Sequence, residues 1–489
     1  MTIDAMTNTQ SSLVPDPQED HFERGFAYAE EGKLEDAIGE YRQALALDTN
    51  SDEIGFHLAM ALNKSGHHAE AIGLCEQVLS RSPEHSPTHI ILGNAHSDLK
   101  QWPQAIAAFR EAARLDPDDN TALFNLGIAL KQSGQVEEAI EVYHQAIRLD
   151  PDEPDVYYSL GNALRRLDRL EEAIAAYQES LRLDANSVEA HCNLGLTLND
   201  LERYEEAEGV LRQGIRLAPH DYELHLNLGI SLKNQGKQEE AMAVQEAAIR
   251  LSPDCADAHV SLGRILRDQG RYEEAISHHQ AAIQLQPDFA YAHENLGYAL
   301  ADSDQHERAV GAYQQALLLS PEAADVYNSL GISLDLTERY DEAITAYQKA
   351  LRLNPDFAAA RNNLGISLKN LGKPDDALAE YRISIDLDPG VANTHTNLGN
   401  ALWDQEDVTG AMASYREAIR LDPDDADVHF FLGNLLAELN HMNEARDEWA
   451  KATSLGDGEV KQQAQEALDA CVLLKVKTPS VVHPPDEEP

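Results

Sequence analysis

Nine short polar side chains recur along the chain at intervals of 34 residues. They are Asn125, Ser159, Asn193, Asn227, Ser261, Asn295, Ser329, Asn363 and Asn397. An asparagine side chain offers both a hydrogen-bond donor and an acceptor, so it can hold the amide groups of an extended peptide without selecting its side chains. A regular row of such groups predicts a peptide-binding surface with broad sequence tolerance. The alternative is that the row only solvates an exposed face of a helix.

Five basic side chains share this spacing, each six residues after a member of the polar row. They are Lys131, Arg165, Lys233, Arg267 and Lys369. If the polar row lines a groove, these cations lie at its rim and meet acidic groups of a ligand. The alternative is that they interact with the negative C-terminal end of a helix dipole.

Residue types that carry catalysis or bind metals show no matching pattern. The 20 histidines include the adjacent pairs His67–His68 and His278–His279, but neighbouring residues on a helix point in different directions and rarely hold one metal ion. The sequence contains no HExxH, P-loop or nucleophile-elbow motif. We therefore expect a protein that is not an enzyme and that has no cofactor or metal site.

Charge and cysteine content indicate the kind of partner and the compartment. The formal net charge is −47, which repels phosphate backbones and makes basic protein segments the favoured partners, unless the acidity only maintains solubility. The four cysteines are far apart in the sequence, which is typical of free thiols in a reducing compartment. Without a signal peptide or an apolar run of membrane-spanning length, the sequence predicts a cytoplasmic protein.

The elements that position these residues follow from the same period. Thirteen consecutive units of 34 residues cover residues 18–459, which is 442 of 489 residues. Counting Gln18 as position 1, position 20 is alanine in all thirteen units, position 8 is glycine in twelve and position 32 is proline in ten. The polar row is position 6 of units 4 to 12, and the basic residues are at position 12. A period near 34 indicates a stacked repeat array.

Each unit has the pattern of two helices joined by a short link. Apolar or small residues at positions 4, 7, 8 and 11 form one face of the first helix, and those near positions 20, 24, 27 and 28 form one face of the second. Acidic pairs such as Glu137–Glu138 open the second helix, and a recurrent Asp-Pro ends it. The small residues at positions 8 and 20 allow the two helices to cross closely, while an aromatic residue at position 24 fills space between units. One pair cannot bury its apolar face alone, so stacking supplies the missing partner and makes an elongated solenoid.

This pattern resembles the tetratricopeptide repeat, which has a small eighth residue, alanine at 20, an aromatic residue at 24 and proline at 32. The resemblance implies an all-α, right-handed superhelical solenoid whose first helices line a concave groove that binds peptides or proteins. We expect a disordered tail at residues 1–17, a capping helix at residues 460–474 and a disordered Pro-rich, acidic tail at residues 475–489. Ala464, Leu468 and Cys471 would face the last unit.

The segments AAARNNLGISLKNLGK and VEAHCNLG are similar to the superhelical repeat region of O-GlcNAc transferases, whose asparagine ladder engages substrate peptides. Only 47 residues lie outside the repeats, which leaves no room for a sugar-transferring domain. The two-carboxylate clamp of chaperone-tail-binding relatives is absent, because position 5 carries residues such as Phe124, Tyr158 and Glu294 in place of its lysine.

The leading interpretation is a scaffold that binds extended segments or partner proteins in the groove of units 4 to 12. A second is an accessory subunit that presents substrates to a separately encoded glycosyltransferase or chaperone. A third is a self-assembling scaffold, which the polar last helix and charged tail disfavour. The sequence specifies neither the partner nor the oligomeric state.

Overall fold

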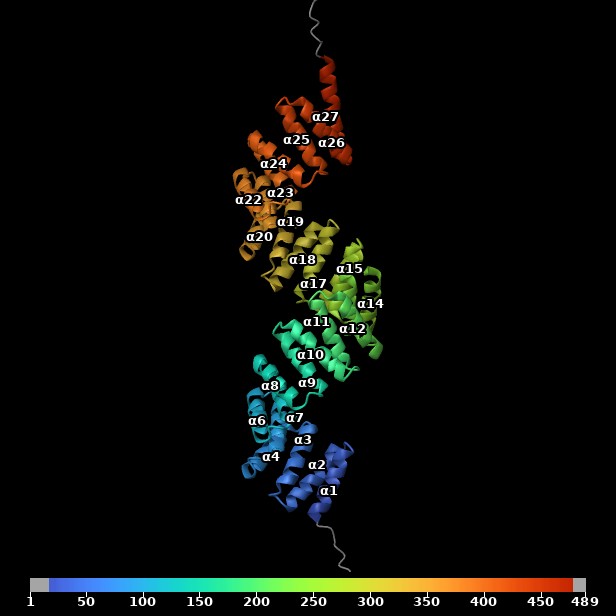
Figure 1. Cartoon of the computed structure of the whole chain (residues 1–489), viewed down its shortest axis with the longest axis vertical. Helices are drawn as coiled ribbons and strands as arrows, with labels where there is room; N and C mark the ends of the chain where they lie inside the picture. Colours follow the sequence, from blue (N-terminus) through green and yellow to red (C-terminus); the bar gives the residue numbers. More distant parts are fainter. Residues whose placement is uncertain (1–16, 478–489) are drawn as a thin grey trace, which may run out of the picture. The chain divides into compact units, whose positions relative to one another are not determined.

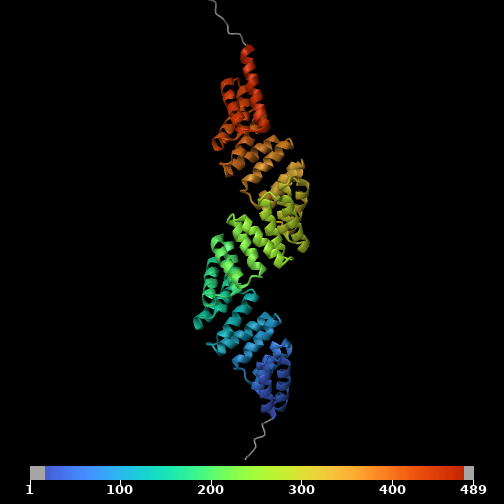
Figure 2. The same ribbon diagram turned by 90° about the vertical axis from the view of Figure 1, so that its right-hand side faces the viewer.

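The chain divides into two compact halves, one ending at Leu251 and the other beginning at Ser252. The computed structural model describes residues 17–477, with side chains up to residue 470, and this range holds 27 helices and no strand. The prediction of an all-α array of helix-turn-helix pairs is confirmed (Figures 1 and 2). The expected disordered tails lie almost entirely in residues 1–16 and 478–489, outside the described range.

In every unit the first helix (helix A) is odd-numbered and the second (helix B) is even-numbered. The N-terminal half contains helices A α1 (Pro17–Glu30), α3 (Asp52–Lys64), α5 (Ser86–Asp98), α7 (Asn120–Gln132), α9 (Pro154–Arg166), α11 (Val188–Asp200) and α13 (Tyr222–Asn234). Its helices B are α2 (Leu34–Leu47), α4 (His68–Arg81), α6 (Trp102–Leu115), α8 (Val136–Leu149), α10 (Leu170–Leu183), α12 (Tyr204–Leu217) and α14 (Gln238–Leu251).

The C-terminal half repeats the arrangement and ends in a single longer helix. Its helices A are α15 (Ala256–Asp268), α17 (Ala290–Asp302), α19 (Ala324–Leu336), α21 (Ala358–Asn370), α23 (Ala392–Asp404) and α25 (Ala426–Glu438). Its helices B are α16 (Tyr272–Leu285), α18 (His306–Leu319), α20 (Tyr340–Leu353), α22 (Pro374–Leu387), α24 (Val408–Leu421) and α26 (Met442–Leu455). The last helix, α27 (Gly458–Lys477), packs on α25 and α26 and buries Ala464 fully and Leu468 partly. The side chain of Cys471 lies outside the described residues.

Local chemistry explains where the helices begin and turn. Side chains such as Asp221 accept hydrogen bonds from the free N–H groups at the start of a helix A, here those of Glu223 and Leu224. The link between helices A and B needs a left-handed residue, which glycine supplies in units such as the fourth (Gly134, φ 89°) and a strained polar residue supplies in others (Asp168, φ 58°).

The crossing inside each unit has a specific structure. The side chain at position 24 lies against the backbone of position 8 in the same unit, so a Cβ added to Gly331 would come within 2.5 Å of the Tyr347 ring. We expected the aromatic residue to fill space between units, whereas its ring lies mainly across the crossing of its own helix pair. Unit 2, the one with alanine at position 8 (Ala59), has the smaller, fully buried Cys75 at position 24. Close packing explains this match of sizes.

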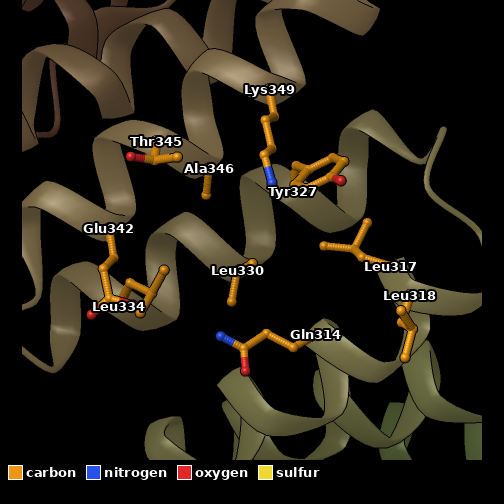
Figure 3. A pocket seen from close by; sticks show the side chains of 10 residues that line it. All are labelled: Gln314, Leu317, Leu318, Tyr327, Leu330, Leu334, Glu342, Thr345, Ala346 and Lys349. Atoms are coloured by element: carbon orange, nitrogen blue, oxygen red, sulfur yellow. The ribbon is translucent and has the colours of Figure 1, made fainter.

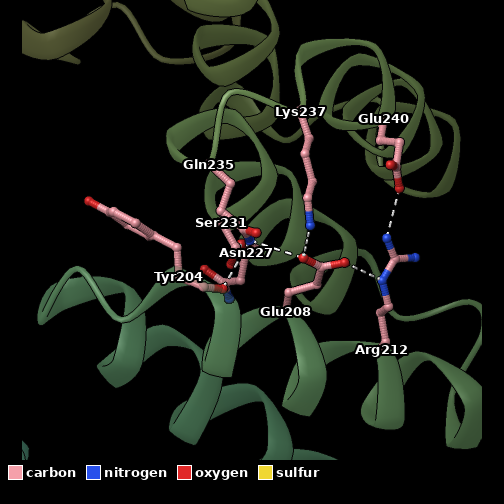
Figure 4. Close-up of polar contacts among 8 residues, drawn as sticks. All are labelled: Tyr204, Glu208, Arg212, Asn227, Ser231, Gln235, Lys237 and Glu240. Atoms are coloured by element: carbon pink, nitrogen blue, oxygen red, sulfur yellow. Dashed lines mark hydrogen bonds and ion pairs between the residues drawn. The ribbon is translucent and has the colours of Figure 1, made fainter.

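Consecutive units are also joined by polar contacts. In the N-terminal half, Glu208 of α12 accepts hydrogen bonds from Lys237 Nζ at 2.7 Å, Gln235 Nε2 at 3.0 Å and Arg212 Nε at 2.9 Å (Figure 4). Arg212 also donates to Glu240 at 2.8 Å. These partners, above all Lys237, lower the pKa of Glu208 to about 2. The cluster therefore ties unit 6 to unit 7 with an ionised carboxylate at its centre.

No helix between residues 17 and 477 combines the length and apolar character needed to cross a membrane.

Candidate functional site

The candidate site is the face of the A helices that points away from their B helices. Within each half, consecutive A helices such as α9 and α11, or α19 and α21, contact each other, whereas consecutive B helices lie farther apart. The A helices therefore form the inner side of each stack, and we call this surface the inner face. Because neighbouring A helices touch, positions 5, 6 and 9 lie at or near the seams between them.

In the N-terminal half, the polar row sits in these seams. Asn193 donates from Nδ2 to Asn162 Oδ1 at 2.9 Å and to the Tyr158 hydroxyl at 3.0 Å, both on the preceding helix A. Asn125 donates in the same way to Asn94 Oδ1 at 3.3 Å. Asn227 and Ser159 are buried, and Asn227 points its amide nitrogen at Cys192 Sγ, 3.6 Å away.

In the C-terminal half, the row behaves similarly. Asn363 Nδ2 donates to Asn328 Oδ1 at 3.1 Å, and Asn397 Nδ2 donates to Asn362 Oδ1 at 3.0 Å. Asn295, only 3% exposed, donates to the Tyr291 carbonyl of its own helix. Ser261 and Ser329 are half-buried, and Ser329 donates to the carbonyl of residue 325. None of the nine side chains is fully exposed, because the neighbouring helix A covers part of each.

This arrangement changes what the row can offer a ligand. The amide nitrogens already hold neighbouring helices together, while Oδ1 of Asn125, Asn193 and Asn397 accepts no hydrogen bond from the described part of the chain. These oxygens are acceptors, so they suit the N–H groups of an extended backbone. These three members of the row therefore have a free acceptor, and within the described chain Asn125 and Asn397 each donate only one hydrogen bond from an NH₂ group that has two N–H donors.

Most of the position-12 cations are engaged by the next unit. Arg165 pairs with Asp200 at 3.0 Å, Arg267 with Asp302 at 2.6 Å and Lys369 with Asp404 at 2.8 Å. In each case the acid occupies position 13, so the partners are 35 residues apart. The same register joins Asn63 to Asp98 and Trp403 to Glu438. Lys233 also has a partner, whereas Lys131 has no ion-pair partner among the described residues.

Two kinds of side chain remain accessible on the inner face. Position 9 is apolar in several units, with Ile128, Leu196 and Ile230 in the N-terminal half and Tyr298, Ile332 and Ile366 in the C-terminal half. Position 13 of unit 10 adds Leu336, which is 61% exposed. Position 2 is acidic and exposed in Asp155, Glu189, Glu223, Asp257, Asp325 and Asp427. The inner face therefore joins backbone acceptors, apolar contact area and negative charge.

The opposite side of the C-terminal half has a crevice of its own. Helices α18, α19 and α20 enclose about 360 Å³, lined by side chains that include Tyr327, Leu330 and Lys349 (Figure 3). At its edge Leu318 is 75% exposed, at a position where several other units carry arginine. The residue pattern of a single unit did not predict this crevice, because it forms between helices of two units.

Comparisons with known protein families show which repeat models match the chain. Models described as tetratricopeptide or TPR repeat match residues 222–255, 263–304, 294–352, 337–372 and 396–458, and the model of the cilia and flagella-associated protein 70 C-terminal domain matches residues 21–223. The chain therefore carries tetratricopeptide repeats, as the sequence predicts. The likeness to O-GlcNAc transferase repeats stays a prediction.

Similar solved structures include the APC/C hetero-tetramer Cut9–Hcn1, at 15% identity over 94% of this chain and 97% of that chain, with a TM-score of 0.47. YrrB, described as a TPR protein with an unusual peptide-binding site, has 27% identity over 38% of this chain and 97% of its own, with a TM-score of 0.34. MamA has 25% identity over 33% of this chain and 95% of its own, with a TM-score of 0.32. No curated protein sequence matches the chain.

Proposed function

We propose that the chain is a non-catalytic scaffold whose inner face binds extended, basic segments of partner proteins. The observation that carries this proposal is that three kinds of group share the inner face, and α11 carries all three in Asn193, Leu196 and Glu189. Three asparagines at position 6 (Asn125, Asn193 and Asn397) offer amide oxygens to backbone N–H groups. Apolar residues at position 9 of several units offer contact area to alternate side chains, and acidic residues at position 2 of several units offer carboxylates to lysine or arginine.

Electrostatics favours a basic ligand over an acidic one. The chain has a net charge of −47, and most position-12 cations are neutralised by position-13 acids. The uncompensated charge on the inner face is thus mainly the position-2 carboxylates. A negative surface speeds association with a positive segment and disfavours a negative one, more strongly at low salt.

Binding of a fluorescent, terminally blocked peptide tests the proposal. In this probe peptide, lysine and valine alternate around a central glutamine. We expect fluorescence anisotropy to show saturable binding that weakens as salt is raised, and no binding of the counterpart with glutamate in place of lysine. Equal binding of the acidic counterpart would overturn the proposal.

A matched pair of variants tests whether the peptide binds on the inner face. Replacing Ile332 and Ile366 by arginine adds positive charge to the inner face at position 9, where unit 8 already carries Arg264. We expect roughly tenfold weaker binding of the probe peptide from lost apolar contact and charge repulsion. Leu318→Arg puts the same side chain on the opposite side, at a position where arginine is common, and should leave affinity unchanged. Equal loss in both variants would contradict an inner-face site.

A further inference from the structure

The register that joins position 12 to position 13 of the next unit is broken between units 4 and 5. The next unit has aspartate at position 13 for the position-12 cations Arg165, Arg267 and Lys369, whereas unit 5 has Arg166 opposite Lys131 of unit 4. The two cations are adjacent, since Arg166 Nη1 donates to the main-chain carbonyl of Lys131 at 3.1 Å. Burial, and then the charge of Arg166, lower the pKa of Lys131. No carboxylate in the described chain forms an ion pair with either side chain.

A cavity of about 380 Å³ lies beside this break, lined by Asn162, Arg165, Arg166, Asp168, Leu170 and Asp200. Two of its donors lack an acceptor in the described chain. Arg165 uses Nη2 for Asp200, but its Nε is buried without a partner. Asn162 Oδ1 accepts from the Tyr177 hydroxyl at 2.8 Å and from Asn193 at 2.9 Å, which fixes the amide and leaves its NH₂ group as a donor.

Charge at the cavity is balanced in a chain that is strongly negative. Two cations, Arg165 and Arg166, and two carboxylates, Asp168 and Asp200, line it, and Lys131 beside Arg166 adds a third cation. Asp200 is neutralised by Arg165, and Asp168 is exposed on the turn after α9. Guanidinium and amide N–H groups around one cavity are suited to an oxyanion, which accepts several charge-assisted hydrogen bonds.

We propose that this cavity binds one oxyanion, a carboxylate or phosphate, carried by an otherwise basic peptide on the inner face. The proposal rests on the proposed function, and it adds a specificity element. The polar row contacts only the ligand backbone, so by itself it allows a bound peptide to shift along the inner face. A cationic site that holds one acidic residue prevents this shift and fixes the position of the peptide. Asn193, which orients Asn162, is itself a member of the polar row, so the anion site and the row adjoin each other.

The test uses the full chain and the same probe peptide, with its central glutamine changed to glutamate or to phosphoserine. We expect the glutamate peptide to bind roughly fivefold more tightly than the glutamine peptide at low salt, with a smaller gain at high salt. A gain for both anionic peptides assigns a general oxyanion site, and a gain for phosphoserine alone assigns a phosphate site. Equal affinity of all three peptides would overturn the proposal while leaving the proposed function intact. If none of the three binds, both proposals fail.

Two variants give the test its control. Arg166→Asp restores the acid found at position 13 in units 6, 9 and 12, so it favours an ion pair with Lys131 and should not unfold the chain. We expect it to abolish the preference for glutamate over glutamine. Lys369→Gln removes a position-12 cation that is already paired with Asp404 and should leave the preference unchanged. A preference that survives Arg166→Asp would contradict the assignment of the site.

Discussion

His279 occupies position 24 of unit 8, where most units have tyrosine, and it is completely buried against Gly263. Neither ring nitrogen has a hydrogen-bond partner. Burial, together with the positive charges of His278, Arg267 and Arg264, lowers the pKa of His279 to about 3. An unfolded histidine has a pKa near 6.5, so the folded chain holds the neutral ring against protonation.

This pKa difference makes stability depend on pH. Because the pKa of His279 is lower in the folded chain than in the unfolded chain, its contribution to the free energy of unfolding is complete above pH 6.5. This contribution is lost as pH falls toward 3. The slope in that window is about 1.4 kcal/mol per pH unit. Substituting phenylalanine for His279, by analogy with Phe109 in unit 3, should remove the dependence. Urea unfolding of the full chain at pH 7 and pH 5 measures it, and an equal loss of stability in both proteins would refute this role of His279.

The residue scale also shows the limits of sequence reasoning. The nine polar residues and five cations could be selected from their spacing, because a 34-residue period places equivalent positions on equivalent faces. Their partners could not be predicted. Arg267 and Asp302 are 35 residues apart, a separation that becomes a contact only when the offset between stacked A helices is known. The burial of Asn227 and Asn295 likewise depends on how closely neighbouring A helices approach.

At the scale of the helix pair, the glycine at position 8 is required by the ring that covers it. Gly331→Ala places a methyl group 2.5 Å from the ring of Tyr347, which is enclosed and unable to move aside. We expect a loss of about 1–3 kcal/mol in the free energy of unfolding, the usual cost of overpacking.

Gly311→Ala in α18 is the matched control, because a Cβ there meets no atom within 4 Å. It should raise stability by about 0.5–1 kcal/mol through helix propensity. Urea denaturation of both variants checks the pair of values. Equal effects of the two substitutions would show that the crossing tolerates a side chain at Gly331.

The helices themselves were largely predictable. Apolar or small residues at positions 4, 7, 8 and 11 define the first helix of a unit, and alanine at position 20, an acidic first turn and proline at position 32 define the second. The thirteen units repeat most of these signals, so they can be compared from one unit to the next. The last helix was harder to delimit, and it spans Gly458–Lys477 where residues 460–474 were expected. It follows the final unit and has no repeated counterpart whose ends could be compared.

At the scale of the whole chain, side chains that repeat from unit to unit supply acceptors for a ligand backbone. Side chains that depart from the repeat distinguish one ligand from another. Asn193, Asn363 and Asn397 each donate to the side chain at position 5 of the preceding unit, and such a repeated contact suits a ligand backbone that also repeats. Departures from the pattern, such as Arg166 in unit 5 and Leu336 in unit 10, occur where single side chains of a ligand can be distinguished. The charge of −47 then determines the general class of segment that approaches.

Photo-crosslinking tests the central claim most directly. The probe peptide, with benzoylphenylalanine at its centre, is bound to the full chain, irradiated and mapped by mass spectrometry. The account predicts crosslinks on odd-numbered helices at position 9 and its neighbours, such as Leu196 or Ile332. Crosslinks confined to even-numbered helices, such as those near Leu318, would contradict it, as would the absence of any crosslink that unlabelled peptide displaces.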